Sequence, residues 1–363
     1  MRSITSVSIF DENIIRTSPA GSCVLRIAEA LAGEVPLHLF SNQEEAPDSW
    51  PVRRTHIPLP PSPVVLRSFL FTLFSCLTYR RSGLTVSTEG AFPFCDVCYA
   101  HFCHRHFLRE HRDAIGGGPL RHAARILNHV WASFTERIAL RSARVIVVPS
   151  HGLARELAST YPDLVSGKIR VIPNPVEIAP LPDSRPPIDG VLRLSFCALG
   201  NFELKGLRLI FEALARIPEI NVHLTVIGGT PGEIRDFKDL APLNKVRFAG
   251  FQHDVRPYLL ASDAFVFPSA YEVFSLVCLQ AAAAGLPLIV TRLHGVEEFM
   301  ADGVTGWVVE RTAESIATAI IDAARDRERL RVMGREARKR IETYSEEEFK
   351  RRWRELLFSL VVA

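Results

Sequence analysis

Several features that would place a chain of 363 residues among membrane or nucleic-acid-binding proteins are absent from this sequence. The longest apolar run, residues 68–79, is too short to span a bilayer. The weakly apolar stretch 3–10 is interrupted by Asp11 and Glu12, so no signal peptide is expected. A formal net charge of +3 is too small to indicate a nucleic-acid partner. We therefore expect a cytoplasmic protein that does not bind nucleic acid.

Two common kinds of cofactor site also lack their sequence signals. No G-x-G-x-x-G follows a predicted strand, which disfavours dehydrogenases. Cys95 and Cys98 form a single CxxC, and His106 and other histidines lie close by, which raises zinc as an alternative. However, no second CxxC follows, and the spacing from Cys98 to His106 is shorter than the roughly twelve residues of a zinc finger. Structural thiols in a reducing compartment are the favoured interpretation, and no metal is expected.

The composition is that of a folded protein with more than one core. Hydrophobic residues make up 47% and charged residues 23% of the sequence. A chain of this length is expected to form two domains. Residues 177–190, EIAPLPDSRPPIDG, hold four prolines and no periodicity, which is typical of a linker. We predict a first domain at 1–178, a linker at 179–190 and a second domain at 191–343, with a C-terminal helix at about 344–360 that could pack back on the first domain.

Buried strands alternate with amphipathic helices in both predicted domains, which indicates doubly wound parallel α/β sheets. In the first domain we expect strands at 7–10, 37–40, 56–59, 84–87, 96–102 and 145–149, and helices at 21–32, 64–81 and 121–144. In the second domain we expect strands at 192–199, 222–228, 246–249, 264–268 and 286–291. Two such domains place a ligand cleft at their interface.

Residues 267–298 contain the strongest local signal for a ligand site. A buried strand ends there, a helix opens near Phe274, and a second buried strand follows. Glu272 and Ser275 stand where strand gives way to helix. Ligands of open α/β sheets bind at the carboxyl ends of strands, and a helix N-terminus offers N–H groups to an anion. The stretch predicts a site for a phosphorylated small molecule.

A second loop, GNFELKG at 200–206, joins another predicted strand to a helix and carries Lys205. A cation at a helix start is unfavourable unless an anion binds there, so we favour a diphosphate ligand over a solvated lysine. Gly228 and Gly229 end a further strand and either let a nucleotide approach or form a simple turn. Glu272 either accepts sugar hydroxyls or caps its helix. Both of these alternatives stay open.

Together these segments resemble a known family. GNFELKG, VIGG, SAYEVFSLVCLQAAAAGLPLIVT, HGVEE and DGVTGWVV follow one another in the order found in the retaining glycosyltransferases of family 4, and VIVVPS and KIRVIPNPVE resemble that family's stretch before the linker. The resemblance implies a GT-B fold, in which two Rossmann-like domains face each other across a cleft. It implies a nucleotide-diphosphate sugar as donor in the second domain, no metal and no further cofactor.

The resemblance also implies roles for individual residues. Glu272 matches the first glutamate of the family motif, which contacts the transferred sugar, and Lys205 neutralises the diphosphate. The implied donor-binding set is Gly21, Gly200, Asn201, Lys205, Gly228, Gly229, Glu272, Phe274, Ser275, Leu276 and Gln280. In the first domain His101 ends a strand where family members carry a histidine facing the cleft, and His104 is the second choice. A core or capping histidine is the equally supported alternative for both.

Three positions depart from the family pattern. Gln280 replaces the glutamate that holds the ribose, which weakens that contact by about 1 kcal/mol. Asn201 replaces an arginine, and Ser275 replaces a glycine. These changes motivate an alternative function, in which an inactive homologue binds a glycan or an active transferase.

The acceptor is expected to be a glycan, a lipid-linked glycan or a small molecule bound by the first domain. Arginines are concentrated there, at positions 105, 109, 112, 121, 125, 137, 141 and 144, and Arg67, Arg80 and Arg81 flank the apolar residues 68–79. One hypothesis is peripheral docking of this domain on the inner face of an anionic membrane. A solvated helix face and a core-packing helix are the favoured interpretation.

Overall fold

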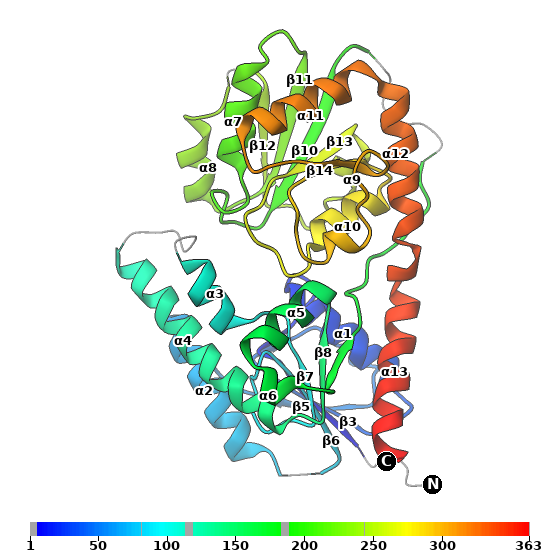
Figure 1. The fold of residues 1–363 in the computed structure, drawn as a ribbon. Coiled ribbons are helices and arrows are strands. Elements are labelled where there is room, and N and C mark those ends of the chain that lie inside the picture. The colour runs from blue at the N-terminus through cyan, green and yellow to red at the C-terminus, as the bar shows by residue number, and fades with distance from the viewer. Residues whose placement is uncertain (1–5, 81, 113–118, 183–188, 243, 363) are drawn as a thin grey trace. The chain divides into compact units, whose positions relative to one another are not determined.

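The computed structural model describes residues 6–80, 82–112, 119–182, 189–242 and 244–362. The chain forms two compact units, which we call unit 1 (Met1–Pro175 and Glu346–Ala363) and unit 2 (Val176–Ser345). Residues 183–188 of the predicted linker lie outside the described residues. Each unit contains a parallel sheet covered by helices on both faces, as the alternation of strands and helices predicts (Figure 1).

Unit 1 contains a seven-stranded parallel sheet in the order β5-β3-β1-β6-β7-β8-β9. The strands are β1 (Val7–Phe10), β3 (Leu37–Ser41), β5 (Val52–His56), β6 (Leu84–Thr88), β7 (Val97–Tyr99), β8 (Val145–Val148) and β9 (Ile169–Val171), and β2 (Asn13–Ile14) pairs separately with β4 (Gln43–Glu44). The chain adds strands outward from β1 in one direction and from β6 in the other. The boundary between β1 and β6 is therefore the topological switch point, where open α/β sheets bind ligands.

The helices of unit 1 lie on the two faces of this sheet. They are α1 (Pro19–Leu31), α2 (Val64–Thr78), α3 (His104–Glu110), α4 (Pro119–Ser142), α5 (His151–Thr160), α6 (Pro162–Val165) and α13 (Glu346–Val362). Figure 1 shows α2 and α4 on one face and α1 and α13 on the other. Trp353 of α13 is fully buried, and its ring centroid lies 4.8 Å from that of Tyr99. The C-terminal helix thus completes the core of unit 1.

Local chemistry explains where two predicted elements were wrong in unit 1. The strand predicted at residues 56–59 lies instead at Val52–His56, because Pro58 and Pro60 have no N–H to donate to a sheet. The helix predicted to open at Gly21 begins at Pro19. Ser18 caps it by accepting a hydrogen bond from the Gly21 N–H, and proline fits the first helical position.

Unit 2 contains a six-stranded parallel sheet in the order β12-β11-β10-β13-β14-β15. The strands are β10 (Leu192–Ala198), β11 (Val222–Gly228), β12 (Val246–Gly250), β13 (Ala264–Phe267), β14 (Leu288–Val290) and β15 (Gly306–Val308). The helices are α7 (Leu207–Arg216), α8 (Pro231–Lys238), α9 (Arg256–Leu260), α10 (Leu276–Ala283), α11 (Ala313–Arg325) and α12 (Arg327–Arg340), with short 3-10 turns η2 (Val296–Glu298) and η3 (Glu342–Tyr344). Here the switch point lies between β10 and β13.

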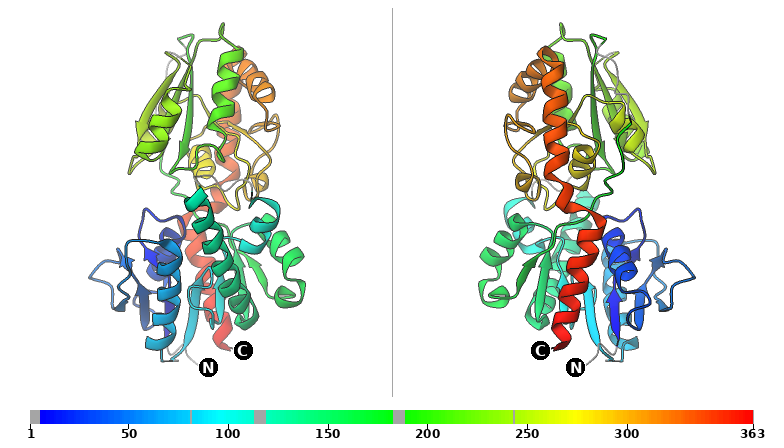
Figure 2. Two further views of the ribbon diagram at one scale, coloured as in Figure 1. Left: turned by 90° about the vertical axis from the view of Figure 1, so that its left-hand side faces the viewer. Right: turned by 90° about the vertical axis from the view of Figure 1, so that its right-hand side faces the viewer.

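Helices α7 and α11 pack together in unit 2, and α10 packs with α12 (Figure 2). The central strands β10, β13 and β14 are almost wholly buried, as expected of a parallel sheet covered on both faces. Within the ranges that the structure describes, no helix is both long enough and apolar enough to cross a membrane.

Candidate functional site

The central pair of the candidate site spans the switch point of unit 2. Lys205 lies in the loop between β10 and α7, and Glu272 lies in the loop between β13 and α10. Because β10 and β13 are hydrogen-bonded neighbours, both loops leave the same edge of the sheet. The Lys205 Nζ forms an ion pair with the Glu272 Oε1, and the two side chains are 20% and 15% exposed. Two residues predicted from separate motifs thus meet at one point.

The backbone of the lysine loop is fixed from several directions. Gly206 adopts a left-handed conformation at φ +83°, and a Cβ there would lie 2.4 Å from the Pro268 carbonyl oxygen, so only glycine fits. The Ala270 N–H donates to the Leu204 carbonyl at 2.9 Å. Arg311, in the loop after β15, donates to the Glu203 carbonyl at 3.0 Å. Arg311 could not be predicted from the sequence, because its partner is a distant backbone carbonyl.

The amides that follow Gly200 are already occupied by a carboxylate of unit 2. The N–H groups of Asn201 and Phe202 donate to Glu233 Oε1, and the Thr230 hydroxyl donates to Glu233 Oε2 at 2.9 Å. Burial alone would raise the pKa of Glu233, but these hydrogen bonds lower it below its ordinary value. The capping-box pattern from Thr230 to Glu233 was the available sequence signal. In this structure the protein itself supplies the negative charge that these two amides bind.

Gly228 and Gly229 have a structural explanation within unit 2. Both have positive φ angles, +91° and +81°. A Cβ on Gly228 would lie 2.1 Å from the Ala198 carbonyl oxygen, and one on Gly229 would lie 2.2 Å from the ring of Phe202. Close packing of the loops after β10 and β11 is therefore enough to explain both glycines, whether or not a nucleotide binds there.

The predicted helix start near Phe274 lies two residues later, at Leu276. Ser275 is the N-cap, and its hydroxyl accepts a hydrogen bond from the Cys278 N–H at 3.4 Å. The first turn of α10 leaves N–H groups without intrahelical acceptors, which gives this end of the helix a partial positive charge. Phe274 is buried, and a Cβ on Gly295 would lie 2.6 Å from its ring. Gln280 is exposed on α10.

His101 follows β7 in unit 1 and is buried beside Tyr99, with a ring-centroid distance of 4.0 Å. Neither of its ring nitrogens has a hydrogen-bond partner of good geometry among the described residues. Burial lowers the pKa of His101 to about 4, and the nearby Asn174 side chain opposes part of that shift. The imidazole is therefore neutral at pH 7 and can either donate or accept a hydrogen bond.

His104 is the first residue of α3 and is also buried. Its Nδ1 lies 3.0 Å from the Nδ1 of His129, and its backbone N–H donates to Glu136 Oε1 at 3.1 Å. Burial, assisted by His129, lowers the pKa of His104 to about 3. Gly21 has a packing role, since a Cβ there would lie 1.7 Å from the Asn13 carbonyl oxygen. Packing against β2 thus explains the glycine at position 21 without a bound phosphate.

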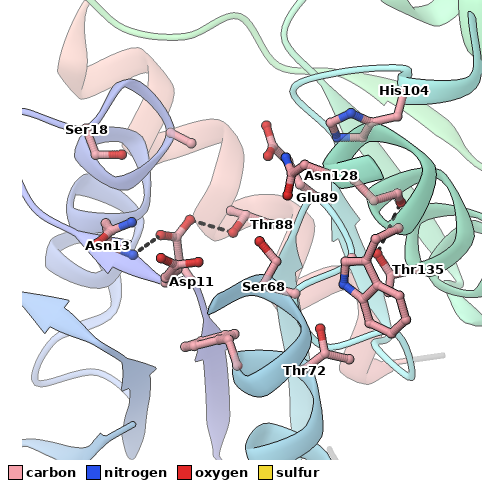
Figure 3. A pocket seen from close by; sticks show the side chains of 17 residues that line it. Asp11, Asn13, Ser18, Ser68, Thr72, Thr88, Glu89, His104, Asn128 and Thr135 are labelled. Atoms are coloured by element: carbon pink, nitrogen blue, oxygen red, sulfur yellow. Dashed lines mark hydrogen bonds between the residues drawn. The ribbon is translucent and has the colours of Figure 1, made fainter. Parts of the chain in front are cut away.

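A cavity of about 220 Å³ opens at the switch point of unit 1 (Figure 3). Asp11 follows β1 and Thr88 ends β6, and the Thr88 hydroxyl donates to the Asp11 carboxylate. Glu89 and Asn128 also line it, and His104 is the one predicted site histidine that does so. Asp11, Glu89 and Asn128 were not predicted as site residues from the sequence. The strand-end positions of the first two were the available signal, but identifying the switch point requires the strand order.

Neither unit shows a metal centre within the described ranges, where no group of three or more His, Cys, Asp or Glu side chains could hold an ion. Cys95 and Cys98 are buried free thiols. The two cysteines thus contribute to the packing of unit 1.

Two family models match the chain. The model described as "Glycosyltransferase Family 4" matches residues 20–179, and the model described as "Glycosyl transferases group 1" matches residues 193–326. Together they extend over most of both units.

Curated relatives match shorter segments. The lipopolysaccharide core biosynthesis glycosyltransferase LpsE of Rhizobium meliloti is 40% identical over 149 residues, which cover 38% of this chain and 43% of the relative. The N-acetyl-alpha-D-glucosaminyl L-malate synthase of Bacillus anthracis is 32% identical over 149 residues, which cover 39% of each chain. The chain thus spans less than half the length of these curated relatives.

Solved structures match the whole length. WaaG, a glycosyltransferase involved in lipopolysaccharide biosynthesis, superposes with a TM-score of 0.80 at 18% identity, covering 97% of this chain and 99% of its own. Anabaena HepE in complex with UDP-glucose gives a TM-score of 0.68 at 15% identity, covering 98% and 99%. These likenesses confirm the predicted GT-B fold class. The two family models together match most of the chain and, with the ordered motifs, show that it belongs to the group 1 glycosyltransferases of family 4.

Proposed function

We propose that this protein transfers a sugar from a nucleotide-diphosphate sugar to an acceptor hydroxyl with retention of the anomeric configuration. The observation that carries the proposal is the Lys205–Glu272 ion pair across the switch point of unit 2. A cation suited to a diphosphate and a carboxylate suited to sugar hydroxyls lie together at the carboxyl ends of the strands, which supports a nucleotide-sugar donor. A complex of HepE, which shares the fold, with UDP-glucose supports a donor of this class.

In the proposed mechanism the protein binds and orients the donor, and the substrates themselves supply the nucleophile and the proton acceptor. Lys205 and the N-terminal end of α10 stabilise the charge that develops on the departing diphosphate, while Glu272 orients the sugar by accepting hydrogen bonds from its hydroxyls. The bond from the anomeric carbon to the phosphate oxygen breaks as the acceptor oxygen attacks from the same face. The leaving phosphate oxygen takes the acceptor's proton, so no protein nucleophile is needed. Lys205 and α10 provide electrostatic stabilisation that a metal ion can provide in other sites.

Unit 1 is proposed to bind the acceptor. His101 is neutral and buried, with ring nitrogens that can form a hydrogen bond to a ligand hydroxyl. The names of LpsE and WaaG place both in lipopolysaccharide biosynthesis, which supports a glycan or lipid-linked glycan as the acceptor.

The surface of α2 and α4 supports peripheral membrane contact by unit 1. The two helices pack together, and the rings of Phe69 and Trp131 lie 5.2 Å apart. Large apolar side chains are nevertheless exposed along both helices, at Val64, Leu66, Phe69, Leu73, Phe74, Leu77, Leu127, Val130 and Phe134. The core-packing interpretation of residues 68–79 therefore fits few side chains of α2, because only Phe71 and Ser75 of that helix are buried.

Charge on the same helices favours an anionic membrane as the partner of this surface. Arg125, Arg137 and Arg141 are exposed on α4, and such side chains are attracted to anionic headgroups. Arg81 and the side chain of Arg121, which belong to the same hypothesis, lie outside the described residues. Exposed apolar side chains bordered by arginine are the composition expected of an interfacial surface.

The function is tested first by ligand binding and then by transfer. A thermal-shift screen with UDP-, GDP-, ADP- and dTDP-sugars should identify the donor, because a ligand at a hundred times its dissociation constant stabilises the fold by about 2.7 kcal/mol. Incubation of that donor with candidate acceptors should yield a glycoside whose anomeric configuration, measured by proton NMR, matches the donor. No nucleotide binding and no transfer would disprove the proposal.

The alternative, an inactive homologue that binds a glycan or a transferase, is favoured by Gln280 and Asn201 alone. Gln280→Glu restores the carboxylate of the family motif on the exposed face of α10. Donor binding by this variant and none by the wild type would support the inactive homologue. Comparable binding by both proteins would support the enzyme.

A further inference from the structure

The cavity at the switch point of unit 1 has an unusual balance of charge. Three carboxylates line it, from Asp11, Glu12 and Glu89. Among the described lining residues there is no lysine or arginine. Arg67 balances Glu12 from outside the lining, with its Nε 2.8 Å from Glu12 Oε1. Among the described side chains no cation pairs with Asp11 or Glu89, so the cavity repels phosphate or carboxylate groups and favours hydrogen-bond donors.

Glu89 is the group in this cavity that is best placed to meet a ligand. Its carboxylate has no hydrogen bond or ion pair with the described residues, and its side chain is open to solvent. Its backbone is left-handed, at φ +48°, which is unfavourable for a residue other than glycine. A Cβ on the neighbouring Gly90 would lie 3.0 Å from the backbone of Thr135, so this turn packs closely against α4. Strained backbone of this kind is concentrated at functional sites.

The walls of the cavity offer further hydrogen-bonding groups and an aromatic ring. The Oδ1 of Asn128 is buried and has no partner within the described structure, so it is an acceptor that a ligand can satisfy. Figure 3 shows Glu89 and Asn128 on the same side of the cavity as His104. The hydroxyls of Ser68 and Thr72 lie along another wall, and Trp131 adds an apolar face. A small ligand with many hydroxyl donors suits this lining.

We propose that this cavity binds a polyhydroxylated group bearing a protonated amine, such as an amino-sugar unit, and that Glu89 pairs with the ammonium. The pairing relieves the repulsion between Glu89 and Asp11, while Asn128 accepts a hydrogen bond from a hydroxyl. This inference rests on the proposed function in one respect, namely that the amine-bearing group is taken to be part of the acceptor.

The test compares three sugars that differ in charge. Binding of D-glucosamine, D-glucose and D-glucose 6-phosphate to the full chain is measured at pH 7.5 by saturation-transfer NMR and titration calorimetry. We expect glucosamine to bind at least tenfold more tightly than glucose, and the phosphate to bind more weakly than either, because a charge-assisted hydrogen bond is the stronger kind. Glu89→Gln should reduce the glucosamine affinity to that of glucose. Asn128→Ala should weaken both sugars alike.

Asp48→Asn is the matched control, since it removes one carboxylate of unit 1 whose side chain is fully exposed and outside the cavity. It should leave all three affinities unchanged. The inference is overturned if the wild type binds no sugar, binds glucose 6-phosphate as well as glucosamine, or shows no preference for the amine. An unchanged preference in a folded Glu89→Gln variant overturns it as well. Nucleotide binding measured on the same sample separates this result from the proposed function, which fails only if no nucleoside diphosphate binds.

Discussion

Exchanging Glu272 for glutamine should have opposite effects on nucleotide binding and on sugar transfer. In the structure Lys205 is paired with Glu272, so an incoming diphosphate must share the lysine with a carboxylate. The Glu272 carboxylate and a phosphate charge about 5 Å from it would repel each other by about 3 kcal/mol at an effective dielectric constant of 20. Partial exposure of both side chains reduces this to about 1.4 kcal/mol, a factor of ten in affinity. Glu272→Gln should therefore bind the nucleoside diphosphate about tenfold more tightly.

Lys205→Met tests the same pair from the other side. It removes a hydrogen bond to a charged group, which contributes roughly 1.5–3 kcal/mol, so diphosphate affinity should fall by about ten- to a hundredfold. Transfer should fall in both variants, because Glu272→Gln weakens the contact with the sugar while Lys205→Met loses stabilisation of the leaving group.

Titration calorimetry with the nucleoside diphosphate and an initial-rate assay with the full donor measure the two effects separately. Glu219→Gln is the matched control, because Glu219 is exposed before β11, at the opposite edge of the same sheet. Competition between Glu272 and the diphosphate for Lys205 is ruled out if Glu272→Gln weakens diphosphate binding as Lys205→Met does, and a role of Glu272 in transfer is ruled out if this variant leaves transfer unchanged.

Three further predictions concern packing, protonation and the surface. In urea unfolding, Gly228→Ala should destabilise the protein by more than about 3 kcal/mol and Gly250→Ala by about 1 kcal/mol. Both glycines have positive φ angles, but only a Cβ at position 228 would clash with its neighbours. Equal losses of stability would contradict a packing role for Gly228. The pKa of His101 is lower in the folded state than in the unfolded chain, so the unfolded chain binds the proton first as the pH falls. Between pH 7 and 4.5 the free energy of unfolding of the wild type should therefore fall by about 2–3 kcal/mol relative to that of His101→Gln. Parallel stability curves for the two proteins would contradict this. Leu77→Glu should abolish co-flotation of the protein with phosphatidylglycerol vesicles. Val332→Glu, the same kind of change at another exposed position, should leave it intact. A wild-type protein that does not float with the vesicles would contradict membrane contact by α2 and α4.

Much of the fold and part of the candidate site could be predicted from the sequence, because their signals are local. Buried strands alternating with helices indicated doubly wound sheets, and the ordered motifs located Lys205 and Glu272 at strand-to-helix loops. Helix ends were less predictable. Pro19 and Ser275 determine two of them through capping geometry, which shifts a boundary by a residue or two without changing the apolar periodicity.

The tertiary structure decided what depends on strand order and on contacts between distant residues. Hydrophobic periodicity shows that a segment is a strand but not which strand lies beside it, so only the sheet order identified the two switch points. For the same reason the sequence could not show that Glu233 occupies the amides after Gly200, or that Glu89 and Asn128 share a cavity. The ordered motifs were enough to indicate the family and to single out Lys205 and Glu272. Tertiary packing determined that these two side chains pair and which charges line the cavity of unit 1, because both arise from side chains that are far apart in the chain.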